Sequence, residues 1–235
     1  MTSASPAAPA AGPVFVRLLA RVAGAGAGVG DGPPLAAALA RWIDWPRAVI
    51  LASALDGPVV ATTTGRPFDA AEDAACMQAR AQVREAILSD TVLSAPAPAT
   101  PDANADFAAL RARYVAHQRA ILAVTGRLRG RLRDMLAALP AGQRLAEVDA
   151  AMEQALGPRE HALLSTVPDL LGLQFTRLQA QASAPPQDAV ALSLARPWFD
   201  RFRLEMRELL LAELDVRFSP VEALLAALRT TDPTP

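Results

Sequence analysis

The side chains that most often perform nucleophilic or acid–base chemistry are few in this chain. It has one cysteine, Cys76, and two histidines, His117 and His161. A cysteine and a histidine that are distant in sequence can form a nucleophilic pair, so Cys76 could act with either histidine. Cys76 and His117 are more simply interpreted as packed side chains. Cys76 lies in an alanine-rich helical segment, and His117 lies on an apolar helical stripe. We therefore predict no catalytic residue and no enzymatic activity.

The motifs that hold metals, phosphates or cofactors are also missing from the sequence. Neither Glu-x-x-His nor His-Glu-x-x-His occurs, and no Gly-x-Ser-x-Gly is present. All 23 basic residues are arginine, which excludes a P-loop lysine, a Schiff-base lysine and a lysine general base. The glycine-rich segment Gly24–Gly32 does not have the Gly-x-Gly-x-x-Gly spacing and follows a helical pattern. We expect no cofactor and no metal.

Charge and hydropathy restrict the partners and the compartment. The net charge of −1 gives no general attraction to nucleic acid or anionic membranes. No uncharged stretch reaches eighteen apolar residues, so we predict no membrane insertion. The N-terminus lacks both the basic start and the apolar core of a signal peptide, and the single cysteine fits a reducing compartment. The expected location is cytoplasmic.

The composition favours closely packed helices. Hydrophobic residues make up 52% of the chain, and alanine alone accounts for more than a fifth. We predict an all-α fold: an elongated helical hairpin or bundle with near-heptad apolar stripes, plus a smaller N-terminal helical region. The expected divisions are a tail at 1–13, the N-terminal helical region at 14–93, a proline-rich linker at 94–104, a long antiparallel helical hairpin at 105–182, a second linker at 183–188, C-terminal helices at 189–229 that close the bundle, and a tail at 230–235.

One N-terminal segment allows two structures. Asp56-Gly57 between two apolar runs is typical of a β-hairpin. Pro58, however, cannot donate to a strand ladder, and Pro46 is well placed to begin a helix that ends at Gly57. Both structures stay open for 48–64, and we favour the helix. The other predicted helices of this region are Phe15–Val22, Leu35–Trp45 and Phe68–Val92.

The hairpin is predicted from two long apolar stripes separated by a breaker. Apolar residues recur at steps of three and four from Phe107 to Leu139 and again from Leu145 to Leu178. Pro140-Ala141-Gly142 lies between the two runs and predicts a tight turn. Gly157-Pro158 and Pro168 predict joints or kinks in the second run.

The densest apolar stripe lies in Pro197–Leu228. Ser219-Pro220-Val221-Glu222 reads as a capping box, which predicts that one helix ends near Phe218 and a short one follows. Arg201–Glu205 and Glu213–Arg217 are spaced to pair along the helix. The stripe is first a core element that closes the bundle, and its candidate anchors for a partner are Phe199, Phe202, Met206, Leu210 and Leu214.

Arginines are concentrated on the first helix of the hairpin. The residues 127–133 read RLRGRLR, with Arg127, Arg129, Arg131 and Arg133. These side chains could be solvated or paired inside the chain, could steer an acidic protein partner, or could follow a phosphate backbone. Nucleic acid is the least favoured of these, because Tyr114 is the one aromatic residue near them that could stack on bases. We expect a non-enzymatic scaffold or adaptor that binds a helical partner or itself, with an anionic-polymer or nucleic-acid binder as the alternative.

Four segments resemble a bacterial family that is catalogued only as a domain of unknown function. They are GPVFVRLLARV, LARWIDW with ASALDG, MEQAL with PREHALLSTVPDLL, and FRLEMRELLLAELDVRFSPVEALLAALR. Members of that family tend to be encoded beside stator-like membrane proteins with a coiled-coil tail and beside OmpA-like proteins. The resemblance implies a cytoplasmic accessory subunit of an envelope-associated, motor-like complex, with the coiled-coil tail as a partner. It implies no catalytic residue.

Overall fold

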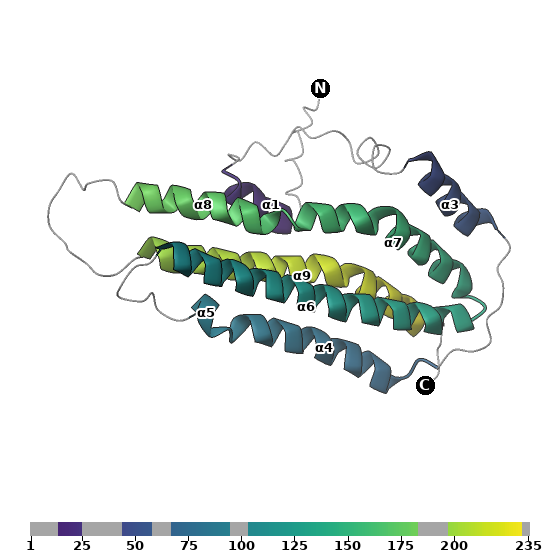
Figure 1. The fold of residues 1–235 in the computed structure, drawn as a ribbon. Coiled ribbons are helices and arrows are strands. Elements are labelled where there is room, and N and C mark those ends of the chain that lie inside the picture. Colours follow the sequence, from purple (N-terminus) through teal and green to yellow (C-terminus); the bar gives the residue numbers. More distant parts are fainter. Residues whose placement is uncertain (1–13, 25–43, 58–66, 95–102, 183–196, 232–235) are drawn as a thin grey trace, which may run out of the picture.

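The computed structural model describes residues 14–24, 44–57, 67–94, 103–182 and 197–231, and helices are the only regular secondary structure in these ranges. Two long helices, α6 (Ala103–Ala138) and α9 (Pro197–Thr231), lie side by side at the centre of an elongated bundle (Figure 1). The other helices pack around them: α1 (Val14–Val22), α3 (Trp45–Asp56), α4 (Ala70–Leu88), α5 (Thr91–Ser94), α7 (Gln143–Leu164) and α8 (Val167–Ala182). The predicted all-α fold class is confirmed.

The long hairpin forms as predicted. α6 ends at Ala138, and α7 begins at Gln143 and returns beside it, with α8 continuing in the same direction (Figure 1). Gly142 is buried in the turn, where an added Cβ would lie 2.6 Å from the carbonyl oxygen of Leu136. α7 continues through Pro158, and the break falls instead at Ser165-Thr166. A joint or kink was predicted at Gly157-Pro158, and the helix is not divided there. Pro168 lies in the first turn of α8, where its missing N–H breaks no helical hydrogen bond.

α9 runs parallel to α6 and antiparallel to α4. Phe107 of α6 packs near Phe202 of α9, and further along Tyr114 contacts Glu213. At one end of the bundle the rings of five residues from α6, α8 and α9 pack together, in tilted and edge-on contacts with centroids 5.1–6.4 Å apart: Phe107, Phe175, Trp198, Phe199 and Phe202. The C-terminal segment therefore packs into the core of the bundle as one helix.

The capping box predicted at Ser219 is wrong, because α9 passes through Pro220 without ending. The hydroxyl of Ser219 donates to the carbonyl of Asp215 at 3.1 Å, and the carboxylate of Glu222 pairs with Arg80 of α4. The buried apolar stripe continues across the proline through Phe218, Val221 and Leu225. Burial of this stripe offsets the roughly 3 kcal/mol that an interior proline costs a helix.

The described N-terminal helices pack on the other helices of the bundle. α1 packs on α8 and α9, α4 and α5 pack on α6 and α9, and α3 packs on α7. The helix favoured for 48–64 is confirmed over 48–56, with Asp44 as its N-cap and Pro46 in its first turn. The segment predicted as one helix over Phe68–Val92 breaks at Asp90, whose Oδ1 accepts the N–H groups of Val92 and Leu93 at 2.9 and 3.3 Å.

Several sequence predictions fall outside the described residues. They are the tail at 1–13, most of the helix predicted for Leu35–Trp45, the end of the segment 48–64, and the linker at 183–188. The proline-rich linker predicted for 94–104 is shorter than expected at both ends, since Ser94 belongs to α5 and α6 begins at Ala103.

Candidate functional site

The five side chains predicted as partner anchors lie in the core of the bundle. None of them is more than 3% exposed, and they are Phe199, Phe202, Met206, Leu210 and Leu214. In this packing they cannot contact a partner, because the helices that surround α9 already cover them. A stripe that packs inside a bundle has the same period as one that docks a partner, so the sequence alone does not separate the two.

Three of the four arginines predicted to face a partner are paired inside the chain. Arg129 and Arg133 both contact Asp149 of α7, with N–O distances of 2.8 and 3.1 Å. Arg131 pairs with Glu72 of α4 at 2.5 Å. Burial alone would lower the pKa of Arg129, but the hydrogen bond and charge of Asp149, with Glu153 and Glu160 behind it, raise it. These arginines therefore form ion pairs that connect α6 to α4 and to α7.

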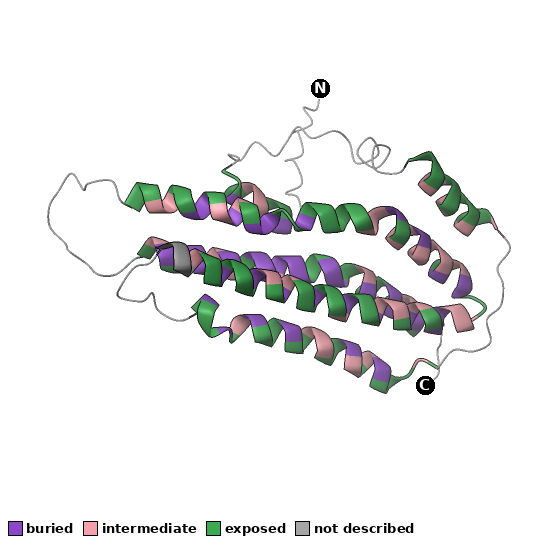
Figure 2. Ribbon diagram, in the orientation of Figure 1, coloured by how far each residue is buried: buried purple, intermediate pink, exposed green. Residues whose placement is uncertain are grey.

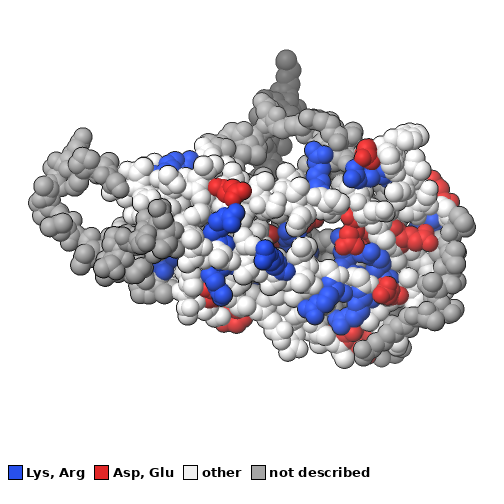
Figure 3. All heavy atoms as spheres, viewed as in Figure 1, with Lys and Arg blue, Asp and Glu red and all other residues white. Residues whose placement is uncertain are grey.

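Arg127 is the exception among the four. Its Nε donates to the carbonyl of Ala123 in its own helix at 3.3 Å, and it has no ion pair among the described residues. The side chain of Arg127 is exposed. In the view of Figure 3, basic side chains are spread over the middle of the molecule with acidic side chains among them.

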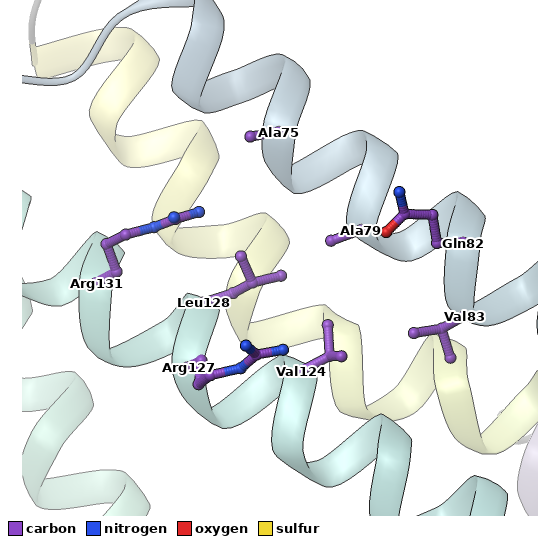
Figure 4. A pocket seen from close by; sticks show the side chains of 8 residues that line it. All are labelled: Ala75, Ala79, Gln82, Val83, Val124, Arg127, Leu128 and Arg131. Atoms are coloured by element: carbon purple, nitrogen blue, oxygen red, sulfur yellow. The ribbon is translucent and has the colours of Figure 1, made fainter.

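A groove of about 440 Å³ lies beside Arg127, between α4 and α6. On the α4 side the groove is lined by the short side chains of Ala75 and Ala79, which leave it open. α9 passes behind the groove (Figure 4). Its other lining residues are Gln82, Val83, Val124, Leu128, Arg127 and Arg131. Val83 and Leu128 are buried, so the floor is apolar, whereas the guanidinium groups of α6 lie at the rim. Such a surface suits an apolar side chain that is accompanied by a carboxylate.

Comparison with protein families shows which family the chain belongs to. The model of a family described as "Protein of unknown function (DUF3348)" matches residues 1–230. The chain belongs to this family. The resemblance noted in the sequence is thereby confirmed over nearly the whole DUF3348 chain. Comparison with curated proteins and with solved structures finds no match.

The structure does not bring the cysteine of this DUF3348 chain together with His117. The thiol of Cys76 is buried against α6, where Arg131 lies 4.0 Å from its sulfur, and burial raises the pKa of the thiol. His117 is buried against Asp90, with Nε2 at 2.8 Å from Oδ2, and His161 is exposed at the end of α7. In the described parts of the chain no group of three or more histidine, cysteine or acidic residues could hold a metal ion. No helix there is long and apolar enough to cross a membrane.

Two polar clusters are buried, and the sequence did not predict their burial. The predicted pair of Glu213 with Arg217 forms, but Glu213 is fully buried and also accepts hydrogen bonds from Gln118 and Tyr114. Asp90 is also buried, and Arg113 donates to its carboxylate from Nε at 2.8 Å. The sequence signal for both is weak, because polar residues are also frequent on solvated helical faces.

Proposed function

We propose that this DUF3348 chain is a non-enzymatic helical scaffold that binds a helical protein partner in the groove between α4 and α6. The observation that supports this is an apolar floor beside an arginine without an ion pair among the described residues. Apolar residues at steps of three and four on a partner helix would enter the groove between Val83 and Leu128. Aspartate or glutamate beside them would meet Arg127 at the rim.

The resemblance to the family adds a context for this partner. A cytoplasmic accessory subunit of an envelope-associated, motor-like complex would meet the coiled-coil tail of its membrane protein. A coiled-coil tail offers an apolar stripe with charged residues on both flanks, which is the surface that the groove accepts.

The alternative, an anionic-polymer or nucleic-acid binder, has less support. Five of the seven arginines in Arg111–Arg133 pair with acidic residues of the chain, which reduces the free positive charge of α6. Arg119 and Arg127 are the two without such a pair in the described residues. Retention of DNA or RNA on a filter at low salt, lost on Arg119→Glu with Arg127→Glu, would favour the alternative.

Fluorescence anisotropy tests the proposal with a designed helical peptide that carries leucine at positions i, i+3, i+4 and i+7 and glutamate on both flanks. We expect the peptide to bind, and its lysine-flanked counterpart to bind at least about tenfold more weakly. Ala79→Trp should fill the groove and weaken binding about tenfold or more, and Arg127→Glu should act in the same direction. Arg84→Glu is the matched control, since Arg84 is exposed on α4 but does not line the groove.

A second measurement uses the coiled-coil tail itself. The tail of the membrane protein encoded beside members of the family should co-purify with the wild-type chain and not with Ala79→Trp. Equal binding of both peptides, or binding that neither variant weakens, would contradict the proposal.

A further inference from the structure

A second pocket, of about 320 Å³, lies where α6 passes the junction between α7 and α8. It shares no lining residue with the groove between α4 and α6. Exposed residues follow the outer sides of α6 and α8 (Figure 2), and Arg119 and Leu122, which line this pocket, are exposed. The pocket is therefore open to a ligand from solvent.

Every charged or titratable side chain that lines the pocket is basic. These side chains come from three helices and are Arg111 and Arg119 of α6, His161 of α7 and Arg217 of α9. Neither the guanidinium of Arg119 nor the imidazole of His161 has an ion pair or a hydrogen bond among the described residues. An anion in the pocket would therefore gain charge-assisted hydrogen bonds without breaking a contact of either side chain.

The carboxylates next to the other two arginines do not line the pocket. Arg217 donates through Nε to Glu213 at 3.0 Å and through Nη1 to Glu160 at 3.2 Å, so it is held in place and its charge is offset. Arg111 pairs with Asp169 at 3.0 Å, but both side chains are at least half exposed, and such a pair contributes little. Arg111 can therefore turn from Asp169 to a ligand.

Contacts between α6 and α7 place Arg119 and His161 at the same end of the pocket. Gln118, the neighbour of Arg119, donates to the carbonyl of Leu164 at 3.0 Å and so fixes the end of α7 beside this turn of α6. His161 is three residues before Leu164 and lies on the same side of α7. Arg111 is eight residues from Arg119, which is about 12 Å along α6. The pocket therefore has one end with Arg119 and His161 and another with Arg111.

The wall between the two ends is apolar. Leu164 and Pro168 are buried, and Val115 is half-buried. A free inorganic anion would use only the basic groups, whereas an anion joined to an organic body would also cover this wall. The volume of about 320 Å³ is at the lower end of the range for small-molecule sites. The pocket therefore fits a small organic anion.

We propose that this pocket binds the phosphate group of a small organic phosphate ester, with Arg119 and His161 as its main donors. A phosphate monoester carries close to two negative charges at neutral pH and has three acceptor oxygens, so it can bind α6 and α7 at once. The imidazole can donate in either protonation state. A carboxylate has one charge and two oxygens and would use these donors less fully. This proposal goes beyond the scaffold function, and each can fail without the other because the two sites are separate.

Isothermal titration calorimetry with phenyl phosphate tests the pocket. We expect a dissociation constant on the order of 0.1–1 mM. Arg119→Gln should weaken binding at least about tenfold, because it removes the unpaired charge of the pocket. Arg127→Gln is the matched control: Arg127 is also exposed on α6 without an ion pair among the described residues, but it lines the other groove. This control should leave the affinity unchanged.

Two further ligands separate the phosphate group from the organic body. Benzoate has the same ring with a carboxylate and should bind at least about fivefold more weakly than phenyl phosphate. Inorganic phosphate lacks the ring and should also bind at least about fivefold more weakly. Benzoate that binds as tightly as phenyl phosphate would refute the choice of a phosphate group. Inorganic phosphate that binds as tightly would refute the choice of an ester.

Proton NMR locates the bound ligand, since the chain has only two histidines. Phenyl phosphate should shift the ring-proton signals of His161 and leave those of the buried His117 unchanged, with His161→Gln to assign them. No binding of phenyl phosphate at about 10 mM, or equal weakening by Arg119→Gln and Arg127→Gln, would overturn the proposal. So would retention of DNA by a chain that does not bind phenyl phosphate, which would favour the nucleic-acid alternative.

Discussion

Arg217 donates from Nε to Oε1 of Glu213 at 3.0 Å, and both side chains are enclosed in the bundle. On a helix surface such a pair contributes only a few tenths of a kcal/mol. Here Glu213 also accepts from Gln118 of α6 at 2.9 Å, so its loss would leave several buried donors without a partner. Burial and then the charge of Glu213 raise the pKa of Tyr114 well above its usual range, which keeps the phenol protonated as a donor.

Removal of Glu213 should strongly destabilise the bundle. We expect Glu213→Ala to lower the free energy of unfolding by about 3–5 kcal/mol, because the buried Arg217 keeps only the half-exposed Glu160 as an ionic partner, and Gln118 and Tyr114 lose an acceptor. Urea unfolding followed by circular dichroism measures this. Glu208→Ala, at an exposed position of α9, should stay within about 0.5 kcal/mol of wild type. The double variant Glu213→Leu with Arg217→Met should cost less than Glu213→Ala alone, and a larger cost would contradict this account.

Asp90 should make stability depend on pH in the acidic range. Burial alone raises the pKa of Asp90, but hydrogen bonds from Arg113, from His117 and from the N–H groups of Leu93 and Val92 lower it below 3.8. A carboxylate whose pKa is lower in the folded state stabilises the protein above its unfolded pKa. That contribution is lost as the pH falls below about 4 and through the folded pKa.

Comparison of wild type with Asp90→Asn at several pH values measures this contribution. At pH 7 the variant should be less stable by about 1.5–3 kcal/mol, since the hydrogen bonds to the carboxylate are charge-assisted. The difference should shrink as the pH falls below about 4. Asp134→Asn, at an exposed position on α6, should show no such trend. A difference that is constant from pH 7 to pH 3 would refute the assigned cause.

The continuity of α9 predicts a gain in stability on substitution of Pro220 and almost no change on substitution of Ser219. Pro220→Ala should raise the free energy of unfolding by about 1–3 kcal/mol, because it restores an N–H to the carbonyl of Val216 and removes the clash of the ring. Ser219→Ala should change stability by less than about 0.5 kcal/mol, whereas loss of a true N-cap costs about 1 kcal/mol. Thermal unfolding of the two variants distinguishes a continuous helix from two helices.

Three glycines should respond differently to alanine. At Gly126 and Gly130 of α6 an added Cβ would meet nothing within 4 Å, so each substitution should stabilise the helix by up to about 1 kcal/mol. At Gly142 the Cβ would lie 2.6 Å from the carbonyl oxygen of Leu136 and 2.9 Å from its side chain. Gly142→Ala should therefore destabilise the turn between α6 and α7. Differential scanning calorimetry of the single variants would show Tm rising for the first two and falling for the third.

The helices could be predicted from the sequence because their signals are local. The steps of three and four that begin at Phe107, the breaker at Pro140-Ala141-Gly142 and the proline at position 46 each act within a few residues. The pair Arg201–Glu205 also follows from spacing along one helix, and it forms with an N–O distance of 3.3 Å. Helical periodicity and backbone stereochemistry need no knowledge of the rest of the chain.

The roles of the stripes and charges were decided by the tertiary structure. Phe202 and Met206 became core because α6 lies parallel to α9, and Trp45 became surface because α7 takes only one side of α3. Glu222 pairs with Arg80 instead of capping a helix, since α4 brings that arginine within reach. Each of these outcomes depends on which helix lies opposite, and the free energy of burial and pairing across helices exceeds the local preference of a capping sequence.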